Sequence, residues 1–296
     1  MSASTVPAAA EEALEGRSLW VDAWRTLRRN RAAMVGAWVI LGMAVFVIVG
    51  PWLSPYAFDF TDFANASTGP SFATGHVFGT DTLGRDLYVR VLYGGRISLL
   101  IGVVATAVSL VMGVTYGAVA GYFGGRLDHL MMRIVDILYA LPFMFLVILL
   151  MVFFGRNILL MFAAIGAINW LDMARIVRGQ TLSLKHREFV EAAQAQGVRA
   201  FAIIRRHIVP NLLGVVAVYV TLTIPQVILV ESFLSFLGLG VQEPMTSWGA
   251  LVHEGADQLE NAPWMLIVPA VFLATTLFCF NFVGDGMRDA LDPKDR

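Results

Sequence analysis

Six long apolar stretches dominate this sequence, and they cover residues 32–53, 97–120, 134–154, 158–174, 211–238 and 264–284. A helix of about 20 apolar residues is long enough to cross the hydrocarbon core of a bilayer. Every backbone N–H and C=O group must find a partner inside that core, and a helix supplies one within each segment. Hydrophobic residues make up 57% of the chain and charged residues 15%, which excludes an ordinary soluble domain. The sequence therefore predicts an all-α polytopic membrane protein with six transmembrane helices and both termini on one side.

The positions of Lys and Arg indicate which side that is. Cytoplasmic loops of membrane proteins carry an excess of these two residues. Of the 21 in the chain, the ones on the side opposite the termini are Arg85, Arg90, Arg96 and Arg156. All the others share the side of the termini, so both termini are predicted to be cytoplasmic and the segment 54–96 to be periplasmic.

Residues 1–31 precede the first span and are predicted to form a cytoplasmic tail and an amphipathic helix. Residues 1–16 are rich in Ala, Ser and Glu, a composition typical of disorder. Beyond Ser18, one helical face collects the apolar residues Leu19, Trp20, Ala23, Trp24 and Leu27. This pattern favours a helix in the membrane interface, and it is equally compatible with an extension of the first span. Residues 32–296 then form the transmembrane domain.

The periplasmic segment 54–96 is longer than a connection between two helices needs, and we expect it to form a structural cap over the bundle. Two pairs of opposite charge stand one helical turn apart in the chain. Asp86 and Arg90 predict an ion pair on a short helix in this segment, and Arg133 and Asp136 predict one at the start of the third span.

Three features inside the spans carry further predictions. Pro142 predicts a kink in the third span. Glu231 lies in the apolar fifth span, where a carboxylate is costly unless it faces water or a partner. We expect Glu231, with Ser232 and Ser235, to face the transport path near its outer end, and a buried pair is the alternative. Close helix packing is expected at the small residues of the second span, Gly102, Ala105, Ala107, Ser109, Gly113, Gly117 and Ala118.

A charged insert, residues 179–210, separates the fourth span from the fifth. Residues Glu188 to Gln196 are good helix formers, and Gly197 stands where a helix ends in a left-handed residue. Pro210 suits the first turn of the next helix. The insert therefore predicts a short helix, a break and a second short helix. Another backbone can approach the first helix closely at Ala192, Ala193 and Ala195. A plain cytoplasmic loop is the alternative.

The insert resembles a known family motif. Glu191-Ala192-Ala193, three further residues, Gly197 and the later Val209-Pro210 are similar to the EAA loop of permease subunits from binding-protein-dependent ABC importers. The stretch from Gly79 to Asp86, Gly-Thr-Asp-Thr-Leu-Gly-Arg-Asp, resembles the dipeptide, oligopeptide and nickel permease branch of that family. The ending Gly-Asp-Gly-Met-Arg-Asp-Ala-Leu-Asp-Pro at residues 284–293 also resembles this branch, and several stretches are most similar to its oligopeptide permeases.

The resemblance implies a type I ABC importer permease fold with a cytoplasmic coupling helix, in a subunit that imports oligopeptides across the bacterial inner membrane. It implies four partner subunits, namely a second homologous permease, two ATPase subunits that bind ATP and Mg, and a periplasmic peptide-binding protein. Contact with the ATPase is implied for Glu188, Glu191, Ala192, Ala193, Gly197 and Pro210. Contact with the binding protein is expected at Asp81, Arg85, Asp86 and Arg90.

Catalytic and nucleotide-binding signatures are missing from the sequence. Neither lysine, Lys185 or Lys294, stands in the Gly-Lys-Ser/Thr order that cradles phosphates, so ATP must be bound elsewhere. The histidines lack metal-ligand spacing, and the single cysteine, Cys279, allows no disulfide within the chain. We therefore expect no catalytic, cofactor or metal site and no nucleic-acid partner. A dipeptide or nickel permease remains an alternative, as does a proton-coupled secondary transporter that uses Glu231.

Overall fold

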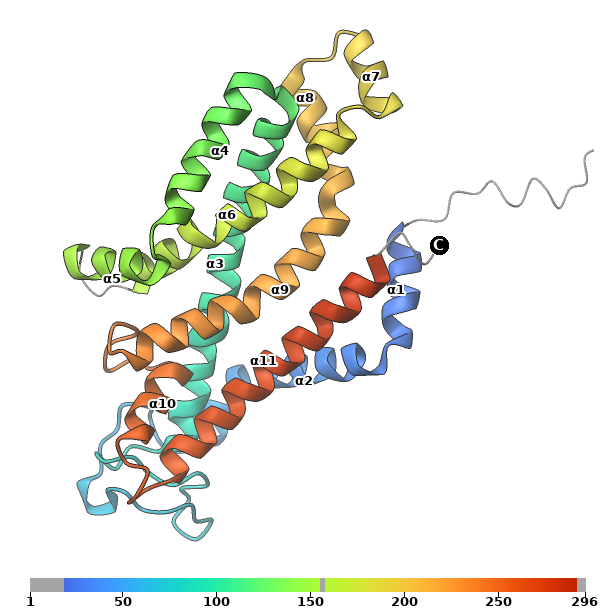
Figure 1. Cartoon of the computed structure of the whole chain (residues 1–296). Helices are drawn as coiled ribbons and strands as arrows, with labels where there is room; N and C mark the ends of the chain where they lie inside the picture. Colours follow the sequence, from blue (N-terminus) through green and yellow to red (C-terminus); the bar gives the residue numbers. More distant parts are fainter. Residues whose placement is uncertain (1–18, 155–157, 292–296) are drawn as a thin grey trace, which may run out of the picture.

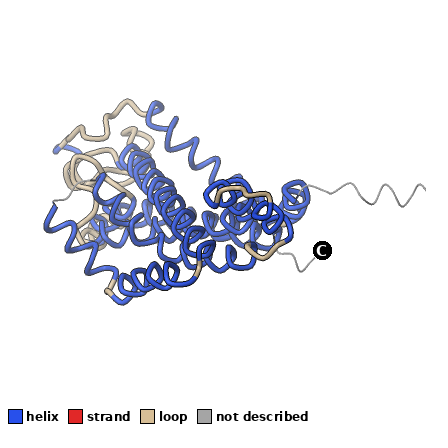
Figure 2. Tube along the Cα trace, turned by 90° about the horizontal axis from the view of Figure 1, so that it is seen from above, coloured by secondary structure: helices blue, strands red, loops and turns tan. Residues whose placement is uncertain are grey.

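A computed structural model of the chain describes residues 19–154 and 158–291. Its helices are α1 (Leu19–Arg29), α2 (Arg31–Val49), η3 (Gly50–Leu53), η4 (Phe63–Asn65), α3 (Leu87–Phe123), α4 (Gly125–Ala140), α5 (Phe143–Phe154), α6 (Ile158–Leu184), α7 (Glu188–Ala195), α8 (Ala200–Ile203), η5 (Ile204–Ile208), α9 (Val209–Phe236), α10 (Trp248–Ala256) and α11 (Trp264–Leu291). Figure 2 draws helices and loops but no strand in these ranges, so the all-helical prediction is confirmed there. The predicted disordered tail, residues 1–16, and Arg156 lie outside the described residues.

Several of the described helices are long and apolar enough to cross a membrane. Four qualify alone, namely Arg31–Leu53, Leu87–Phe123, Ala200–Phe236 and Trp264–Leu291. The pair α4 and α5 makes a fifth only if it is counted as one span, which is bent by 81°. The fourth predicted stretch lies within α6, which is in neither group. The chain is thus a multi-pass membrane protein, and the count of six spans stays a prediction.

The bend between α4 and α5 falls at Pro142, where the sequence predicts a kink. The residue before a proline avoids helical geometry, and Leu141 is accordingly extended, with φ −77° and ψ 132°. The helix therefore ends at Ala140 rather than bending smoothly. In Figure 1, α5 runs across the molecule while α4 runs along it.

The central element is α3, a single helix of 37 residues that begins ten residues earlier than the predicted second span. Its first turn is fixed by Asp86, whose carboxylate accepts a hydrogen bond from the backbone N–H of Val89. It packs closely along α6, because a Cβ at Gly117 would lie 2.4 Å from the carbonyl oxygen of Ala174. The prediction of close packing at small residues is therefore confirmed at this contact.

Residues 54–86, called the cap segment below, gather with α10 at one end of the molecule, and α7 lies at the opposite end (Figure 1). From α2 the chain passes through η3 into the cap segment, and Tyr88 Oη at the start of α3 donates a hydrogen bond to Gly50 O of η3. The start of α11 also reaches the cap segment, since Trp264 Nε1 donates a hydrogen bond to Thr80 O. Because α2 ends there and α11 begins there, α1 and the last turn of α11 lie away from the cap segment. That both termini are cytoplasmic stays a prediction.

Candidate functional site

The predicted short helix of the charged insert is present as α7 (Glu188–Ala195), with Gln196 as its C-cap. Gly197 has φ +76°, and its N–H donates a hydrogen bond to Gln194 O. The N–H of Val198 reaches back to Ala193 O, which completes a Schellman motif. A Cβ at Gly197 would meet nothing within 4 Å, so the position requires glycine for its backbone angle rather than for space.

One face of α7 rests on the chain itself. Val190 and Ala193 are buried in a cluster that includes Tyr122 from α3 and Ile208 from η5. The side-chain amide of Gln194 also donates a hydrogen bond to Tyr122 Oη, at 3.3 Å. Ala193 is only 6% exposed, so most of its surface is covered by the chain itself, and its contact with a partner stays a prediction. It lies on the helix face opposite Glu191, and helical geometry turns that face toward the chain's own core.

The other face of α7 is free in this chain. Its exposed residues are Glu188, Phe189, Glu191, Ala192 and Ala195, and Gly197 follows them at the exposed end of the helix. Glu188, Glu191, Ala192 and Gly197 of the predicted docking residues are therefore exposed, and their contact with an ATPase stays a prediction. Phe189 is not among the predicted residues, although it is 41% exposed. A large apolar side chain between the two carboxylates Glu188 and Glu191 is the signal that points to it, because such a side chain gains by burial against a partner.

The second predicted short helix is wrong as a separate element. Instead, α8 (Ala200–Ile203) continues through the π-helical turn η5 (Ile204–Ile208) into α9 (Val209–Phe236). Pro210 lies in the first turn of α9, as predicted. In the π-helical turn the N–H of Val209 donates to Ile204 O, five residues back. The insert is thus joined without a break to the helix that carries Glu231.

An ion-pair cluster holds the cap segment to α3 and α10. The Asp81 carboxylate accepts hydrogen bonds from Arg85 Nε and Arg90 Nη1, each at 2.6 Å. Arg90 also donates to both carboxylate oxygens of Glu254 on α10, at 2.6 and 3.0 Å. Arg85 donates in addition to Glu243, at 2.9 Å. These charges tie three separate segments of the chain together.

The predicted ion pair between Asp86 and Arg90 is wrong. Asp86 caps α3, so its carboxylate points back over the first turn, where it lies 2.8 Å from His76 Nδ1. The four residues predicted to contact a binding protein are also buried, with exposed fractions of 0% for Asp81, 7% for Arg85, 2% for Asp86 and 1% for Arg90. They therefore build the predicted cap, and their side chains do not offer a docking surface.

Arg85 keeps its charge in this buried setting. Burial alone would lower its pKa, but hydrogen bonds to Asp81 and Glu243 outweigh that effect, and the pKa of Arg85 lies above its ordinary value. The side chain of Glu243 is 63% exposed, which makes it the member of the cluster that faces outward.

Glu231 lies on α9 and is 0% exposed, so the expectation that it faces the transport path is wrong for this conformation. The alternative of a buried ion pair also fails, because the partners of the Glu231 carboxylate among the described residues are hydroxyl groups. Ser235 Oγ donates to Oε1 at 2.6 Å, and Ser98 Oγ from α3 donates to Oε2 at 3.2 Å. Ser232 Oγ lies 3.5 Å from Glu231 Oε2, and the residue Ser232 is 6% exposed. The cluster joins α3 to α9 and, through Ser247, to the start of α10.

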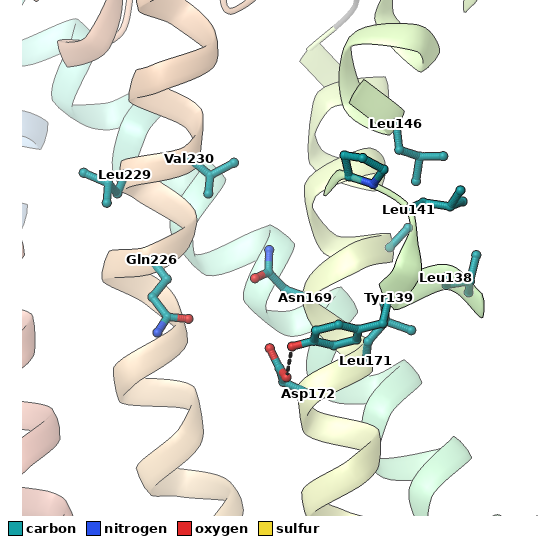
Figure 3. A pocket seen from close by; sticks show the side chains of 12 residues that line it. Leu138, Tyr139, Leu141, Leu146, Asn169, Leu171, Asp172, Gln226, Leu229 and Val230 are labelled. Atoms are coloured by element: carbon teal, nitrogen blue, oxygen red, sulfur yellow. Dashed lines mark hydrogen bonds between the residues drawn. The ribbon is translucent and has the colours of Figure 1, made fainter. Parts of the chain in front are cut away.

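A pocket of about 570 Å³ opens between the α4–α5 bend, α6 and α9. Figure 3 shows Tyr139, Asn169, Asp172 and Gln226 around it among apolar side chains. Tyr139 Oη donates a hydrogen bond to Asp172. None of these residues is predicted as a site from the sequence, because they come from three helices far apart in the chain.

Beside this pocket, the predicted ion pair of Arg133 and Asp136 is replaced by one between helices. Arg175 Nη2 on α6 donates to Asp136 on α4, at 2.8 Å. The guanidinium of Arg175 also lies over the ring of Tyr139, 4.2 Å from its centroid. Because α4 and α6 pack side by side, Asp136 pairs with Arg175 of α6 rather than with Arg133, one turn away on its own helix.

Comparison with known proteins gives consistent matches. Residues 113–296 match the family described as binding-protein-dependent transport system inner membrane component, and residues 18–70 match the N-terminal TM domain of oligopeptide transport permease C. The chain is 61% identical to the oligopeptide transport system permease protein OppC of Escherichia coli K12, over 96% of this chain and 94% of the relative. It is 58% identical to OppC of Haemophilus influenzae, over 97% and 92% respectively.

A solved structure shares the fold. A chain of the MetNI methionine ABC transporter, in an inward-facing conformation, superposes with a TM-score of 0.56 at 19% identity. The match covers 67% of this chain and 94% of the solved one. At this identity the likeness concerns the fold alone.

Proposed function

This chain belongs to the family of binding-protein-dependent transport system inner membrane components, and on that premise we propose that it is a permease subunit of an ATP-driven importer of oligopeptides. The high identity to oligopeptide permeases over nearly the whole chain supports the substrate class. The observation that carries the mechanism is α7, a short helix held by one face on the chain and exposed on the other.

The proposed assembly lies in a bacterial inner membrane. A second, homologous permease completes the translocation path, two ATPase subunits bind ATP and Mg on the cytoplasmic side, and a periplasmic binding protein delivers the peptide. In this proposal the present chain performs no catalysis. Its part is to form half of the path and to convert the movement of the ATPase subunits into movement of its own helices.

The route of that conversion follows from the contacts of α7. Its exposed face, with Glu191 and Ala192, docks into a groove of an ATPase subunit. Its buried residues Val190 and Ala193 transmit the movement to α3 and η5, which they contact. Since η5 continues into α9, a displacement of α7 reaches the helix that borders the pocket of Figure 3. Coupling of this kind requires a stiff element with two positions.

A proton-coupled secondary transporter is not supported. Such a carrier needs a carboxylate that meets water during its cycle. Glu231 is the candidate predicted from the sequence, and it is enclosed by hydroxyl groups. Family membership accounts for the energy source without it. Dipeptide and nickel permeases remain the neighbouring alternatives, and no contact in the structure favours either.

The proposal is tested by pull-down from solubilised membranes that contain all subunits. The variant Glu191→Arg/Ala192→Arg places charge and bulk on the exposed face of α7. We expect it to lose the ATPase subunits and peptide uptake, while the second permease still copurifies. The control is Thr26→Arg on α1, which is also exposed and lies on another element. Retention of the ATPase subunits by the α7 variant, with normal uptake, contradicts the docking role.

A further inference from the structure

The pocket between the α4–α5 bend, α6 and α9 has an unusual lining for a membrane-embedded surface. Among its apolar residues stand a phenol, a carboxylate and two amides, from Tyr139, Asp172, Asn169 and Gln226 (Figure 3). They come from α4, α6 and α9, and all border the same hollow. Gln226 and Asp172 are exposed in this chain, and Asn169 is half-buried.

This surface does not suit contact with lipid tails. An exposed amide without a partner costs several kcal/mol in hydrocarbon, about 4–8 on transfer scales that allow no hydrogen bond. Within the part of the chain that the structure describes, the Gln226 side chain has no hydrogen bond. The ion pair of Asp136 and Arg175 beside the pocket is also open, with side chains 57% and 41% exposed. Charged side chains in membrane proteins turn toward the bundle interior or toward water.

The surface is better suited to face water than to form a water-free interface with the second permease. The fully buried core of a protein interface is depleted of charged residues. Here a carboxylate stands inside the hollow, and an ion pair flanks it. The polar groups are spread around an open volume of about 570 Å³ rather than paired across a flat face. That volume is in the range of sites that enclose a small ligand.

We propose that this pocket is part of the wall of the peptide path, and that the Asn169 and Gln226 amides bind the backbone of an oligopeptide in transit. The proposal rests on the proposed function. A side-chain amide offers both donors and an acceptor, and so matches the N–H and C=O groups of any peptide bond. Asn169 Nδ2 already donates one N–H to Ile165 O, at 2.9 Å, so its second N–H and its oxygen are the groups that face the peptide. Asp172, positioned by Tyr139, adds an anionic acceptor for N–H donors. The apolar residues around them accommodate side chains of any shape, so the contacts do not depend on peptide sequence.

Thiol labelling tests whether the pocket faces water and peptide. Cys279, the chain's one cysteine, is first replaced by Ser, and Asn169→Cys or Gln226→Cys then supplies a single thiol. Only a thiol that reaches water forms the reactive thiolate. We expect a charged maleimide to label both positions in the assembled importer, and penta-alanine delivered by the binding protein to slow the labelling.

The other labelling results overturn the proposal. A thiol that reacts only when the second permease is absent assigns the pocket to the subunit interface. A thiol that reacts under neither condition assigns it to lipid. Labelling that penta-alanine does not slow shows a wet surface that binds no peptide.

A second experiment measures transport directly. Asn169→Leu and Gln226→Leu keep the approximate size of the side chain and remove its hydrogen bonds. We expect each to lower penta-alanine uptake by about 2- to 10-fold, the effect of one hydrogen bond, with the complex intact. The matched control is Thr221→Val on α9. Its hydroxyl already donates to Val218 O, and it lies beside Gly284 of α11.

Uptake of penta-alanine tests the pocket assignment and the proposed function separately. If the wild-type importer transports penta-alanine and both Leu variants match it, the pocket assignment is wrong and the proposed function stands. If the wild-type importer takes up no oligopeptide at all, the proposed function itself is wrong.

Discussion

Glu231 illustrates how a buried carboxylate is accommodated without a cation. Three serine hydroxyls from two helices donate to it, and one of them, Ser98 Oγ, accepts a hydrogen bond from Trp248 N at the start of α10. The helices approach closely here, since a Cβ at Gly249 would lie 2.4 Å from Ser232 Cα. The carboxylate thus acts as a shared acceptor at the junction of α3, α9 and α10.

At the residue scale, we predict that Glu231→Leu destabilises this junction and that Glu231→Gln does not. The leucine leaves buried hydroxyls without their acceptor, at a cost of about 1–3 kcal/mol for each unsatisfied group. The glutamine keeps one acceptor oxygen and the size of the side chain. The measurement is the melting temperature of the purified complex in detergent. Equal melting temperatures for the two variants contradict the assigned role.

At the element scale, the contact of α3 with α6 depends on a row of glycines one turn apart. A Cβ at Gly113 would lie 2.5 Å from Met173 Cβ, and one at Gly121 would lie 2.7 Å from Thr181 Cβ. With Gly117 between them, the row lets the two backbones touch over three turns. This contact fixes the position of α6, and α6 in turn carries Asn169 and Asp172 into the pocket.

We therefore predict that Gly117→Leu disrupts the packing of α3 on α6. The side chain has no room beside Ala174 O, and overpacking of this kind costs about 1–3 kcal/mol or more. The readout is the amount of folded chain in the membrane, together with its melting temperature. Gly179→Leu on α6 is the matched control, since a Cβ there meets nothing within 4 Å. If both variants behave like the wild type, the contact is looser than the structure indicates.

At the scale of the whole molecule, different elements lie at its two ends. The cap segment and α10 occupy one end, held by Asp81, Arg85 and Arg90, and α7 occupies the other (Figure 1). The proposed partners differ in the same way, with a binding protein on one side of the membrane and ATPase subunits on the other. The two ends of the molecule therefore correspond to the two sides of the membrane in the proposed transport.

This arrangement of the two ends predicts on which side of the membrane each of them lies. In a background of Cys279→Ser, a thiol at the exposed Thr74 of the cap segment should react with an impermeant maleimide in cells with a permeable outer membrane. A thiol at the exposed Thr26 on α1 should react only after the inner membrane is opened, because α1 lies away from the cap segment. The reverse pattern, or equal labelling of both, contradicts the predicted cytoplasmic N-terminus.

The sequence alone determines the features that arise from short stretches of chain. The length of the apolar stretches predicts membrane helices, and Gly197 predicts a left-handed residue after α7. Pro142 predicts the bend between α4 and α5, and Pro210 predicts the start of α9. Each of these features depends mainly on the backbone of a few neighbouring residues. The helix α7 belongs to this class, because a helix start, a helix end and a family motif all fall within twenty residues.

Only the tertiary structure decides where charged side chains find their partners. Asp136 and Glu231 are bound by groups from other helices, Arg175 of α6 and Ser98 of α3, and Asp86 is bound by His76, ten residues earlier, rather than by Arg90. Electrostatic and hydrogen-bonding energy depends on distance in space, and packing brings together groups that lie far apart in the chain, such as Arg90 and Glu254, which are separated by 164 residues. The pocket of Asn169 and Gln226 arises in the same way, because three helices must pack before it exists.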